Sequence, residues 1–194
     1  GFPQVQAAAA FLADRFHKQL PTADVGVVLG SGLGAVADDV VGGGGSAVDY
    51  GAIPHFPTSS VEGHKGRMVC GAVKGRTVLL MQGRVHRYEG YPASSVVFPI
   101  RVLQALGVKK LIVTNAAGGL GDGFRAGDLM VIEDHLNLTG DNPLVGQNDA
   151  RFGARFPDMS EAYSRRLRAL ALEVGKARGL TLQKGVYAGL LGPS

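Results

Sequence analysis

Short apolar runs alternate with amphipathic stretches along this chain of 194 residues, and that alternation predicts an α/β protein. The first stretch, residues 4–19, repeats apolar side chains at helical spacing, so we expect a helix there. Apolar runs of strand length come next, at residues 24–29, 67–73, 76–82, 110–114, 128–137 and 181–191. Further helical patterns lie after residue 34 up to about Val40, at 93–106 and at 160–178.

Two local signals sharpen this outline. Lys74-Gly75 lies between two of the apolar runs and predicts a tight hairpin. Ser160 is expected to cap the helix at 160–178, which Gly179 ends. One hairpin within an otherwise alternating order predicts a single domain over residues 1–194, built as a mixed twisted β-sheet with helices on both faces.

A glycine-rich turn at residues 30–34 (GSGLG) follows the first predicted strand. Such a turn between a strand and a helix is a natural pocket for an anion, because unpaired backbone N–H groups and the helix dipole point at it. The Ser31 hydroxyl adds a further polar group, and its alternative role is to cap the helix. The turn also fits the loose dinucleotide pattern G-x-G-x-x-G/A, with Asp49 at a tolerable distance, so a dinucleotide-binding oxidoreductase is a competing interpretation.

Charged and aromatic residues crowd into residues 83–91 (GRVHRYEGY), directly after the apolar run 76–82. In an extended backbone Arg84, His86 and Tyr88 project from one face. A guanidinium suits phosphate oxygens, an imidazole adds a hydrogen bond, and a phenol packs on a sugar and bonds to it. This stretch therefore predicts a site for an anion with a sugar beside it, and the alternative is a hairpin arm that is merely basic.

Two further loops carry candidate chemistry. Residues 115–119 (NAAGG) form a small-residue loop at the end of the predicted strand 110–114, where the backbone can approach a ligand closely. His64 lies in the sequence GHKG between glycines that would let it move, although a solvent-exposed loop histidine is the commoner outcome.

Composition narrows the class of protein. The chain is 45% hydrophobic and 19% charged with a net charge of +4, which indicates a globular protein that favours small anions. Basic residues are scattered, so we expect no nucleic-acid partner. Cys70 is the single cysteine, so no intrachain disulfide forms and a reducing cytoplasm is expected. We expect no membrane span, since no apolar stretch approaches the roughly 20 residues needed, and no metal site, since ligand spacings are absent.

The chain resembles the trimeric, low-molecular-mass purine nucleoside phosphorylases along nearly all of its length. The matching stretches are VVLGSGLG at 27–34, IPHFPTSSVEGHKGR at 53–67, QGRVHRYEGY at 82–91, TNAAGGL at 114–120, GDLMVIEDHLNLTGDNPL at 127–144, RFGARFPDMSEAY at 151–163 and LLGPS at 190–194. The methylthioadenosine phosphorylases share the fold, but their phosphate-site sequences differ from GSGLG and GRVHRYEGY, so a relative of that kind is a second alternative.

The resemblance implies reversible phosphorolysis of purine ribo- and deoxyribonucleosides in purine salvage, with inorganic phosphate as co-substrate and no cofactor. It assigns phosphate binding to Ser31, His64, Arg84, His86 and the backbone N–H of Ala116, with His64 closing over the ion. The resemblance assigns contacts with the ribose to Tyr88 and to Phe156, which comes from a neighbouring subunit. The base pocket is then lined by Asn115, Ala116, Ala117 and Gly118. The Phe156 contact implies a homotrimer with shared sites, against the alternative that Phe156 is a buried loop anchor.

The chemistry suits these residues without a protein nucleophile. Breaking an N-glycosidic bond builds positive charge on the sugar, which a phosphate dianion held beneath it stabilises and then attacks. Glu89 is expected to orient His86 or Arg84. In the family the sequence continues past GPS with residues that hold the purine, so we expect Ser194 to mark a truncation, and a chain ending there to bind phosphate but turn over poorly. Such a chain could equally act as a non-catalytic phosphate-binding module. The family default is 6-oxopurine nucleosides.

Overall fold

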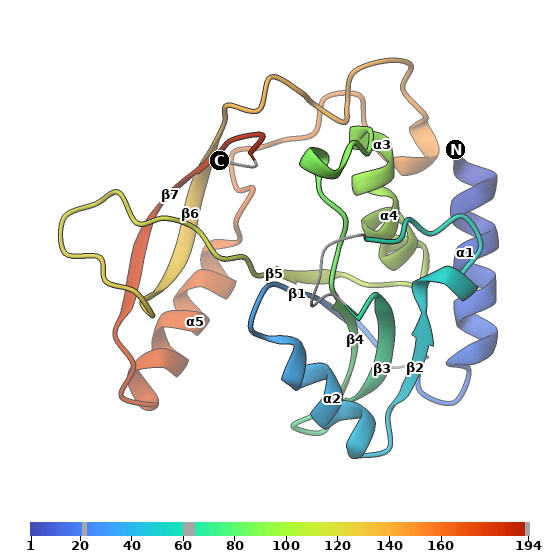
Figure 1. Ribbon diagram of the computed structural model, residues 1–194, viewed down its shortest axis with the longest axis horizontal. Helices are drawn as coiled ribbons and strands as arrows, with labels where there is room; N and C mark the ends of the chain where they lie inside the picture. The colour runs from blue at the N-terminus through green and yellow to red at the C-terminus, as the bar shows by residue number, and fades with distance from the viewer. Residues whose placement is uncertain (21–22, 60–64, 193–194) are drawn as a thin grey trace. The chain divides into compact units, whose positions relative to one another are not determined.

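The computed structural model describes residues 1–20, 23–59 and 65–192 (Figure 1). The chain divides into two compact units, Gly1–Ala116 and Ala117–Ser194. The grouping of the whole chain into one domain stays a prediction.

The first unit is built on a five-stranded sheet in the order β2-β3-β4-β1-β5. The strands are β1 (Val25–Leu29), β2 (Ser46–Asp49), β3 (Arg67–Val73), β4 (Arg76–Gln82) and β5 (Lys110–Val113). β1 runs parallel to both β4 and β5, whereas β2, β3 and β4 pair antiparallel. The predicted mixed sheet is confirmed, although the short strand β2 was not expected from the sequence.

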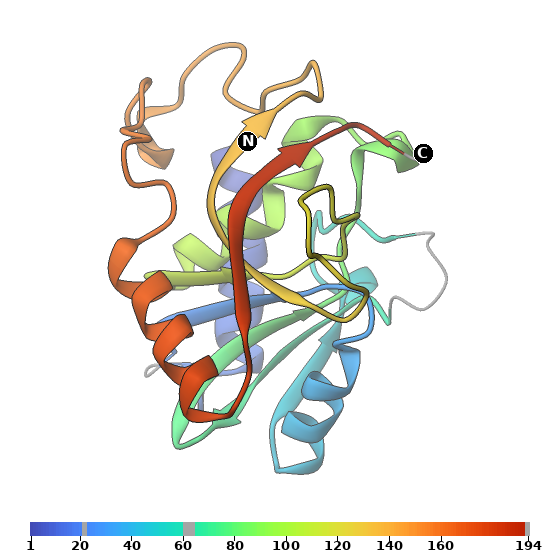
Figure 2. The same ribbon diagram turned by 90° about the vertical axis from the view of Figure 1, so that its left-hand side faces the viewer.

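Helices cover both faces of this sheet (Figure 2). They are α1 (Phe2–Arg15), α2 (Gly34–Gly42), α3 (Ala93–Val96) and α4 (Phe98–Ala105), with short 3-10 turns at Tyr50–Ala52 and Arg87–Glu89. Leu29 of β1 packs with Ala37 and Val40 of α2 in one apolar cluster. Side chains alternate along a strand, and a Cβ placed on Gly26 would indeed meet Leu103 of α4 at 3.2 Å on the opposite face.

The core lies in the central strands because their apolar runs are buried on both faces. Leu79, Leu80 and Met81 of β4 are almost fully buried, and Cys70 of β3 has no exposed surface. The predicted hairpin between β3 and β4 is confirmed. Lys74 and Gly75 both adopt positive φ, at 49° and 76°, as the two-residue turn with the twist of the flanking strands requires.

The second unit is a β-α-β arrangement. β6 (Leu129–Asn137) and β7 (Leu182–Gly189) pair in parallel, and the crossover between them contains the 3-10 turn Ala150–Phe152 and the helix α5 (Arg165–Ala177). The parallel pairing requires a long crossover, which explains why a helix separates the two strands along the chain.

Two helix predictions were wrong in detail. The stretch expected as one helix at 93–106 is two helices, α3 and α4, separated at Val97. Pro99 lies in the first turn of α4, where its missing N–H costs nothing, so the sequence suits a helix start there. The cap of α5 is Ser164, whose hydroxyl accepts a hydrogen bond from the Leu167 N–H, and not Ser160, which lies before the helix.

Candidate functional site

Three loops of the first unit leave the same edge of its sheet. Because β1 lies between β4 and β5 and is parallel to both, the loops after Leu29, Gln82 and Val113 all start at the carboxyl ends of neighbouring strands. Ligands of open α/β sheets bind at this kind of edge. The topology therefore brings together the glycine turn 30–34, the stretch 83–91 and the start of the loop 115–119.

Thr114 connects these three loops. Its hydroxyl accepts a hydrogen bond from the Gly30 N–H (2.8 Å) and donates one to the Val28 carbonyl (2.9 Å). Its carbonyl accepts a hydrogen bond from Nη1 of Arg84 at 3.0 Å. The approach is so close that a Cβ on Gly30 would lie 2.6 Å from the Thr114 carbonyl oxygen, so only glycine fits there. Thr114 was not predicted as a site residue. The feature that could have indicated it is a hydroxyl side chain directly after an apolar strand.

The glycine turn leaves the Ser31 hydroxyl available for a ligand. Gly32 adopts a φ of 84°, and Leu33, which has no capping side chain, is the N-cap of α2. The alternative role of Ser31 as the helix cap is therefore wrong. Ser31 itself is exposed, at the N-terminal end of a nine-residue helix.

His86 and Tyr88 lie together, although the backbone between them is not extended as predicted. Residues 87–89 form a 3-10 turn, so the shared face arises from the turn and not from strand alternation. The His86 and Tyr88 rings stack with their centroids 4.7 Å apart and their planes at 14°. Arg84 is directed instead to the loop after β5 through its bond to Thr114.

The Glu89 carboxylate holds His86 from two sides. One carboxylate oxygen accepts hydrogen bonds from the His86 backbone N–H (2.8 Å) and from ring Nδ1 (3.0 Å). The other accepts one from the Ser59 hydroxyl at 3.0 Å, and the Glu89 side chain is 3% exposed. Because Nδ1 faces a carboxylate, that nitrogen carries the proton and Nε2 is the one left for a ligand.

The remaining predicted residues are placed as follows. The Asn115 amide donates to the carbonyl of Ala116 at 3.1 Å, within its own loop. Ala117 and Gly118 are exposed residues of the second unit. His64 lies outside the described residues.

Phe156 belongs to the second unit and projects from it. Its side chain is 86% exposed, so the alternative of a buried loop anchor is wrong. The guanidinium of Arg155 lies 6.0 Å from the ring centroid and donates hydrogen bonds to the carbonyls of Leu144 and Gly146. An aromatic ring held out from a loop that is tied down in this way is suited to contact another surface.

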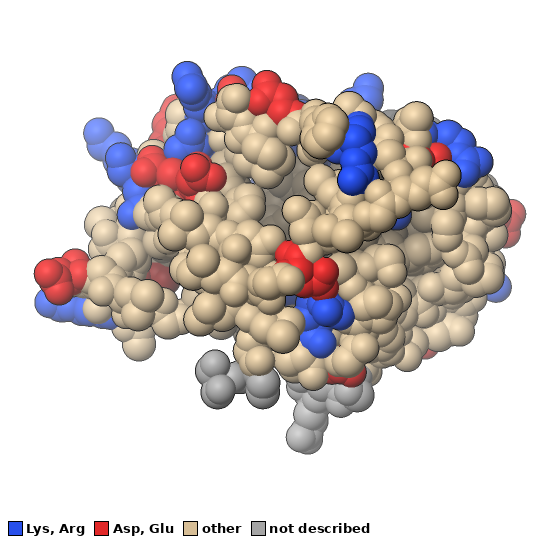
Figure 3. Space-filling view, turned by 90° about the horizontal axis from the view of Figure 1, so that it is seen from above, with Lys and Arg blue, Asp and Glu red and all other residues tan. Residues whose placement is uncertain are grey.

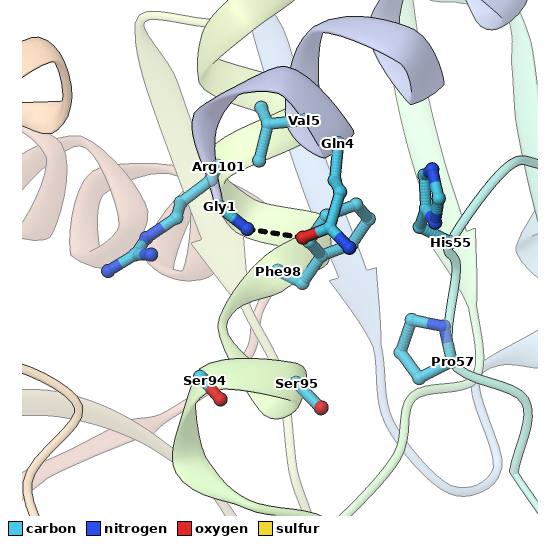
Figure 4. Close-up of a pocket in the computed structure, with 9 residues that line it drawn as sticks. All are labelled: Gly1, Gln4, Val5, His55, Pro57, Ser94, Ser95, Phe98 and Arg101. Atoms are coloured by element: carbon cyan, nitrogen blue, oxygen red, sulfur yellow. Dashed lines mark hydrogen bonds between the residues drawn. The ribbon is translucent and has the colours of Figure 1, made fainter.

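A separate pocket of about 190 Å³ lies between α1, the start of α4 and the segment around His55 (Figure 4). The ammonium group of Gly1 donates to the side chain of Gln4 at its rim, and Arg101 and two serines complete its polar lining. Of the predicted site residues that the structure describes, none lines this pocket.

Charge on the surface is mixed. In the face drawn in Figure 3, Lys and Arg side chains are interspersed with Asp and Glu and do not form one basic patch. Within the described part of the chain, no helix combines the length and apolar character needed to cross a bilayer. The same described residues contain no group of three His, Cys, Asp or Glu side chains placed to hold a metal ion.

Comparison with known proteins identifies the class. Residues 24–194 match the family described as the Phosphorylase superfamily, so the chain belongs to that superfamily. It is 52% identical over 191 residues to purine nucleoside phosphorylase 1 of Geobacillus stearothermophilus, covering 98% of this chain and 68% of that protein. The mouse (Mus musculus) purine nucleoside phosphorylase is 50% identical over 175 residues, which is 88% of this chain and 60% of that protein.

Solved structures agree with the sequence relatives. Isoform 2 of the Schistosoma mansoni purine nucleoside phosphorylase, in complex with cytosine and ribose-1-phosphate, superposes with a TM-score of 0.92 at 39% identity, covering all of this chain and 68% of that one. Another purine nucleoside phosphorylase in complex with ribose-1-phosphate gives a TM-score of 0.92 at 41% identity, covering all of this chain and 72% of that one. Within the superfamily, the chain belongs with the purine nucleoside phosphorylases.

Proposed function

We propose that the protein catalyses the reversible phosphorolysis of purine ribo- and deoxyribonucleosides to the free base and (deoxy)ribose 1-phosphate. The observation that carries this proposal is the junction at Thr114, which ties the Gly30 turn and the Arg84 side chain to one strand end. A chain of this family with that junction has a cationic, N–H-rich edge of the kind that a phosphate ion needs.

The phosphate is bound by the Ser31 hydroxyl, the Arg84 guanidinium, the His86 ring through Nε2 and the Ala116 backbone N–H, with His64 as a further ligand. The hydroxyl, the guanidinium and the backbone N–H donate hydrogen bonds to phosphate oxygens, and the guanidinium adds positive charge. Support comes from the Glu89 carboxylate, which fixes the His86 ring through Nδ1 at 3.0 Å. Glu89 is thus a positioning residue.

The nucleoside lies above the phosphate. Tyr88 packs against the ribose and bonds to it, and its stacking on the His86 ring supports this role. Asn115, Ala116, Ala117 and Gly118 line the base pocket. As the glycosidic bond breaks, the sugar becomes cationic and the base anionic, so a phosphate dianion at the anomeric carbon stabilises the cation electrostatically and then adds to it. Proximity and charge supply the rate enhancement, and no covalent enzyme intermediate is required.

The active unit is a homotrimer in which Phe156 enters the ribose site of a neighbouring subunit. The 86% exposure of Phe156 supports this assignment, because a large aromatic side chain in water is stabilised when a partner covers it. We place the enzyme in the cytoplasm, in purine salvage, and expect 6-oxopurine nucleosides to be preferred.

The deciding assay measures release of hypoxanthine from inosine by the full-length protein, with and without inorganic phosphate. Release that depends strictly on phosphate is expected. Phosphate-dependent cleavage of methylthioadenosine in preference to inosine would favour the methylthioadenosine-phosphorylase alternative. Binding of a nicotinamide dinucleotide without phosphorolysis would favour the oxidoreductase alternative, and phosphate binding without any turnover would favour a binding module.

Subunit mixing tests the shared site. The variants Phe156→Ala and Arg84→Ala are each expected to be nearly inactive, and co-refolding them should restore part of the activity, because some sites then combine an intact Phe156 with an intact Arg84. The matched control mixes Arg84→Ala with His86→Ala, which lie in one subunit's loop and should not complement. Complementation in the control, or its absence in the first mixture, would argue against a Phe156 supplied by a neighbour.

A further inference from the structure

A buried amide lies behind the two anion-binding loops. Gln82 is the last residue of β4, is 4% exposed, and directly precedes the stretch 83–91. Its Nε2 donates to the Gly34 carbonyl (2.7 Å) and to a carboxylate oxygen of Asp38 (3.3 Å). Its Oε1 accepts a hydrogen bond from Nε of Arg67. The oxygen and the nitrogen of the amide are therefore both hydrogen-bonded. The sequence does not indicate this, because a glutamine at the end of an apolar strand looks like an ordinary polar residue at a strand end.

These partners connect the sheet to the first turn of α2. Gly34 ends the glycine turn and begins α2, and Asp38 lies one helical turn further on. Arg67 lies directly opposite Gln82 in the antiparallel pair of β3 and β4, and its guanidinium also binds Asp38. A Cβ on Gly34 would lie 3.3 Å from the Gln82 Nε2, so α2 and β4 are in close contact at this point.

The same residue also fixes the start of the basic stretch. The Gln82 carbonyl accepts a hydrogen bond from the Gly66 N–H at 3.1 Å, and the Gly83 carbonyl accepts one from the buried Tyr50 hydroxyl at 2.8 Å. Arg84 comes next along the chain. The Gln82 side chain thus holds the glycine turn, while its backbone fixes the position of the chain just before Arg84.

We propose that Gln82 is a positioning residue that sets the distance between the phosphate-binding turn 30–34 and the Arg84–His86 stretch. The proposal rests on the proposed function, because it assigns both loops to one phosphate ion. Removing the amide takes away the hydrogen bond that joins the Gly34 carbonyl to β4 and the acceptor of the Arg67 Nε, which lets α2 and its turn shift relative to β4. A shift well below the size of the ion is enough to weaken hydrogen bonds from both loops to it.

Two substitutions separate this role from simple packing. Gln82→Met keeps the length of the side chain and removes all three of its hydrogen bonds. Gln82→Glu keeps the acceptor for Arg67 but directs a second carboxylate oxygen at the Gly34 carbonyl and Asp38, so it should be the more damaging. For both we expect the phosphate KM and the phosphate Kd to rise by about five- to tenfold, while the inosine KM changes by less than about twofold.

Rescue and control variants complete the design. Replacing Asp38 by Asn in the Gln82→Glu background returns a donor to face the new carboxylate and should recover phosphate affinity. Gln104→Met, on the exposed side of α4, makes the same chemical change outside the network and should leave both KM values unchanged. If Gln82→Met does not fold, Asp38→Asn alone weakens the network through its half-exposed member. This variant should also raise the phosphate KM more than the inosine KM, but by a smaller factor.

The measurements are phosphate titration by calorimetry and steady-state phosphorolysis on full-length protein, with the unfolding midpoint recorded without phosphate. Folded Gln82 variants that keep phosphate Kd and KM within about twofold of the unaltered protein would overturn the positioning role and leave the proposed function standing. An unaltered protein that binds phosphate without turnover would overturn the phosphorolysis, and the Kd values would still decide the role of Gln82. An unaltered protein that binds no phosphate overturns both.

Discussion

Thr114 concentrates three contacts of the candidate site in one small side chain and its carbonyl. The hydroxyl spans from the Gly30 N–H to the Val28 carbonyl, and the carbonyl receives Arg84. The residues involved are separated by 84 and 30 positions along the chain, so the arrangement exists only when β1, β4 and β5 are in register. Thr114 is thus sensitive to the whole edge of the sheet.

Thr114→Val tests this junction at nearly constant shape. Valine keeps the β-branched form that suits a strand end but removes the hydroxyl, leaving the Gly30 N–H without its partner. We expect the phosphate KM to rise by about fivefold or more, since a lost buried hydrogen bond costs about 1–2 kcal/mol. Steady-state phosphorolysis of inosine at varied phosphate measures it. Thr77→Val, at the far end of β4, is the matched control and should leave the phosphate KM unchanged.

Glu89→Gln tests the fixation of His86. The amide has no charge and only one acceptor oxygen, so it holds the His86 ring less firmly than the carboxylate that now bonds to N–H and Nδ1. The expected result is a phosphate KM raised by about tenfold with the protein still folded. Ser59→Ala, which removes the contact to the other carboxylate oxygen and leaves both bonds from Glu89 to His86 in place, should have a much smaller effect. Unchanged turnover and phosphate affinity in Glu89→Gln would contradict the assignment.

The sequence indicated which of these residues lie close together but not the backbone conformation that brings them there. The spacing of Arg84, His86 and Tyr88 indicated a shared site, and the two rings do stack. The extended backbone assumed for them was wrong, because Glu89 reaches back to the His86 N–H and closes a 3-10 turn. Thr114 and Gln82 were not found, because hydrogen bonds between distant strands depend on a register that local patterns do not define.

At the scale of elements, apolar runs located the strands well and capping residues located the helix ends poorly. β3 and β4 match the predicted ranges, and the Lys74-Gly75 turn has the dihedral angles that its sequence demands. Strand β2, with the sequence SAVD, is too short and too polar to stand out from a loop. It forms because β3 offers an edge to pair with, which is a tertiary effect.

α5 provides a clean test of capping, because Ser160 is the predicted cap and Ser164 is the observed one. We expect Ser164→Ala to lower the free energy of unfolding by about 1 kcal/mol, since the Leu167 N–H loses its acceptor. Ser160→Ala, four residues earlier and outside the helix, should change it by less than about 0.5 kcal/mol. Urea unfolding compares the two, and equal losses would indicate that Ser164 does not act as the cap.

At the scale of the whole molecule, the first unit depends on pairings that the sequence order conceals. The hairpin of β3 and β4 is local, and its presence could be predicted. The position of β1 between β4 and β5 could not, because Val25 pairs with both Val78 and Lys110 across long intervals of chain. That order nevertheless decides which loops share an edge, and hence the site itself.

Alkaline pH should destabilise the first unit through groups buried in it. Burial raises the pKa of the Cys70 thiol from its usual value of 9.0 to about 11, and burial also raises the pKa of the Tyr50 hydroxyl. An unfolded chain therefore loses the Cys70 proton at lower pH than the folded one does. The contribution of Cys70 to stability is complete below about pH 9 and is lost as pH rises towards about 11.

Urea unfolding at a series of pH values from 8 to 11 measures this effect, at roughly constant ionic strength to limit other charge effects. The free energy of unfolding should fall more steeply above about pH 9 in the unaltered protein than in Cys70→Ala. Parallel curves for the two proteins would show that the thiol does not contribute.

The burial of Cys70 offers a way to measure local opening of the sheet. It is the one sulfhydryl in the sequence, and its side chain has no surface open to solvent. An alkylating reagent can therefore attack it only during excursions in which β3 separates from its neighbours. The rate of alkylation then reports how often those excursions occur. Phosphate bound at the carboxyl edge of the sheet should slow alkylation to the extent that it restrains the strands.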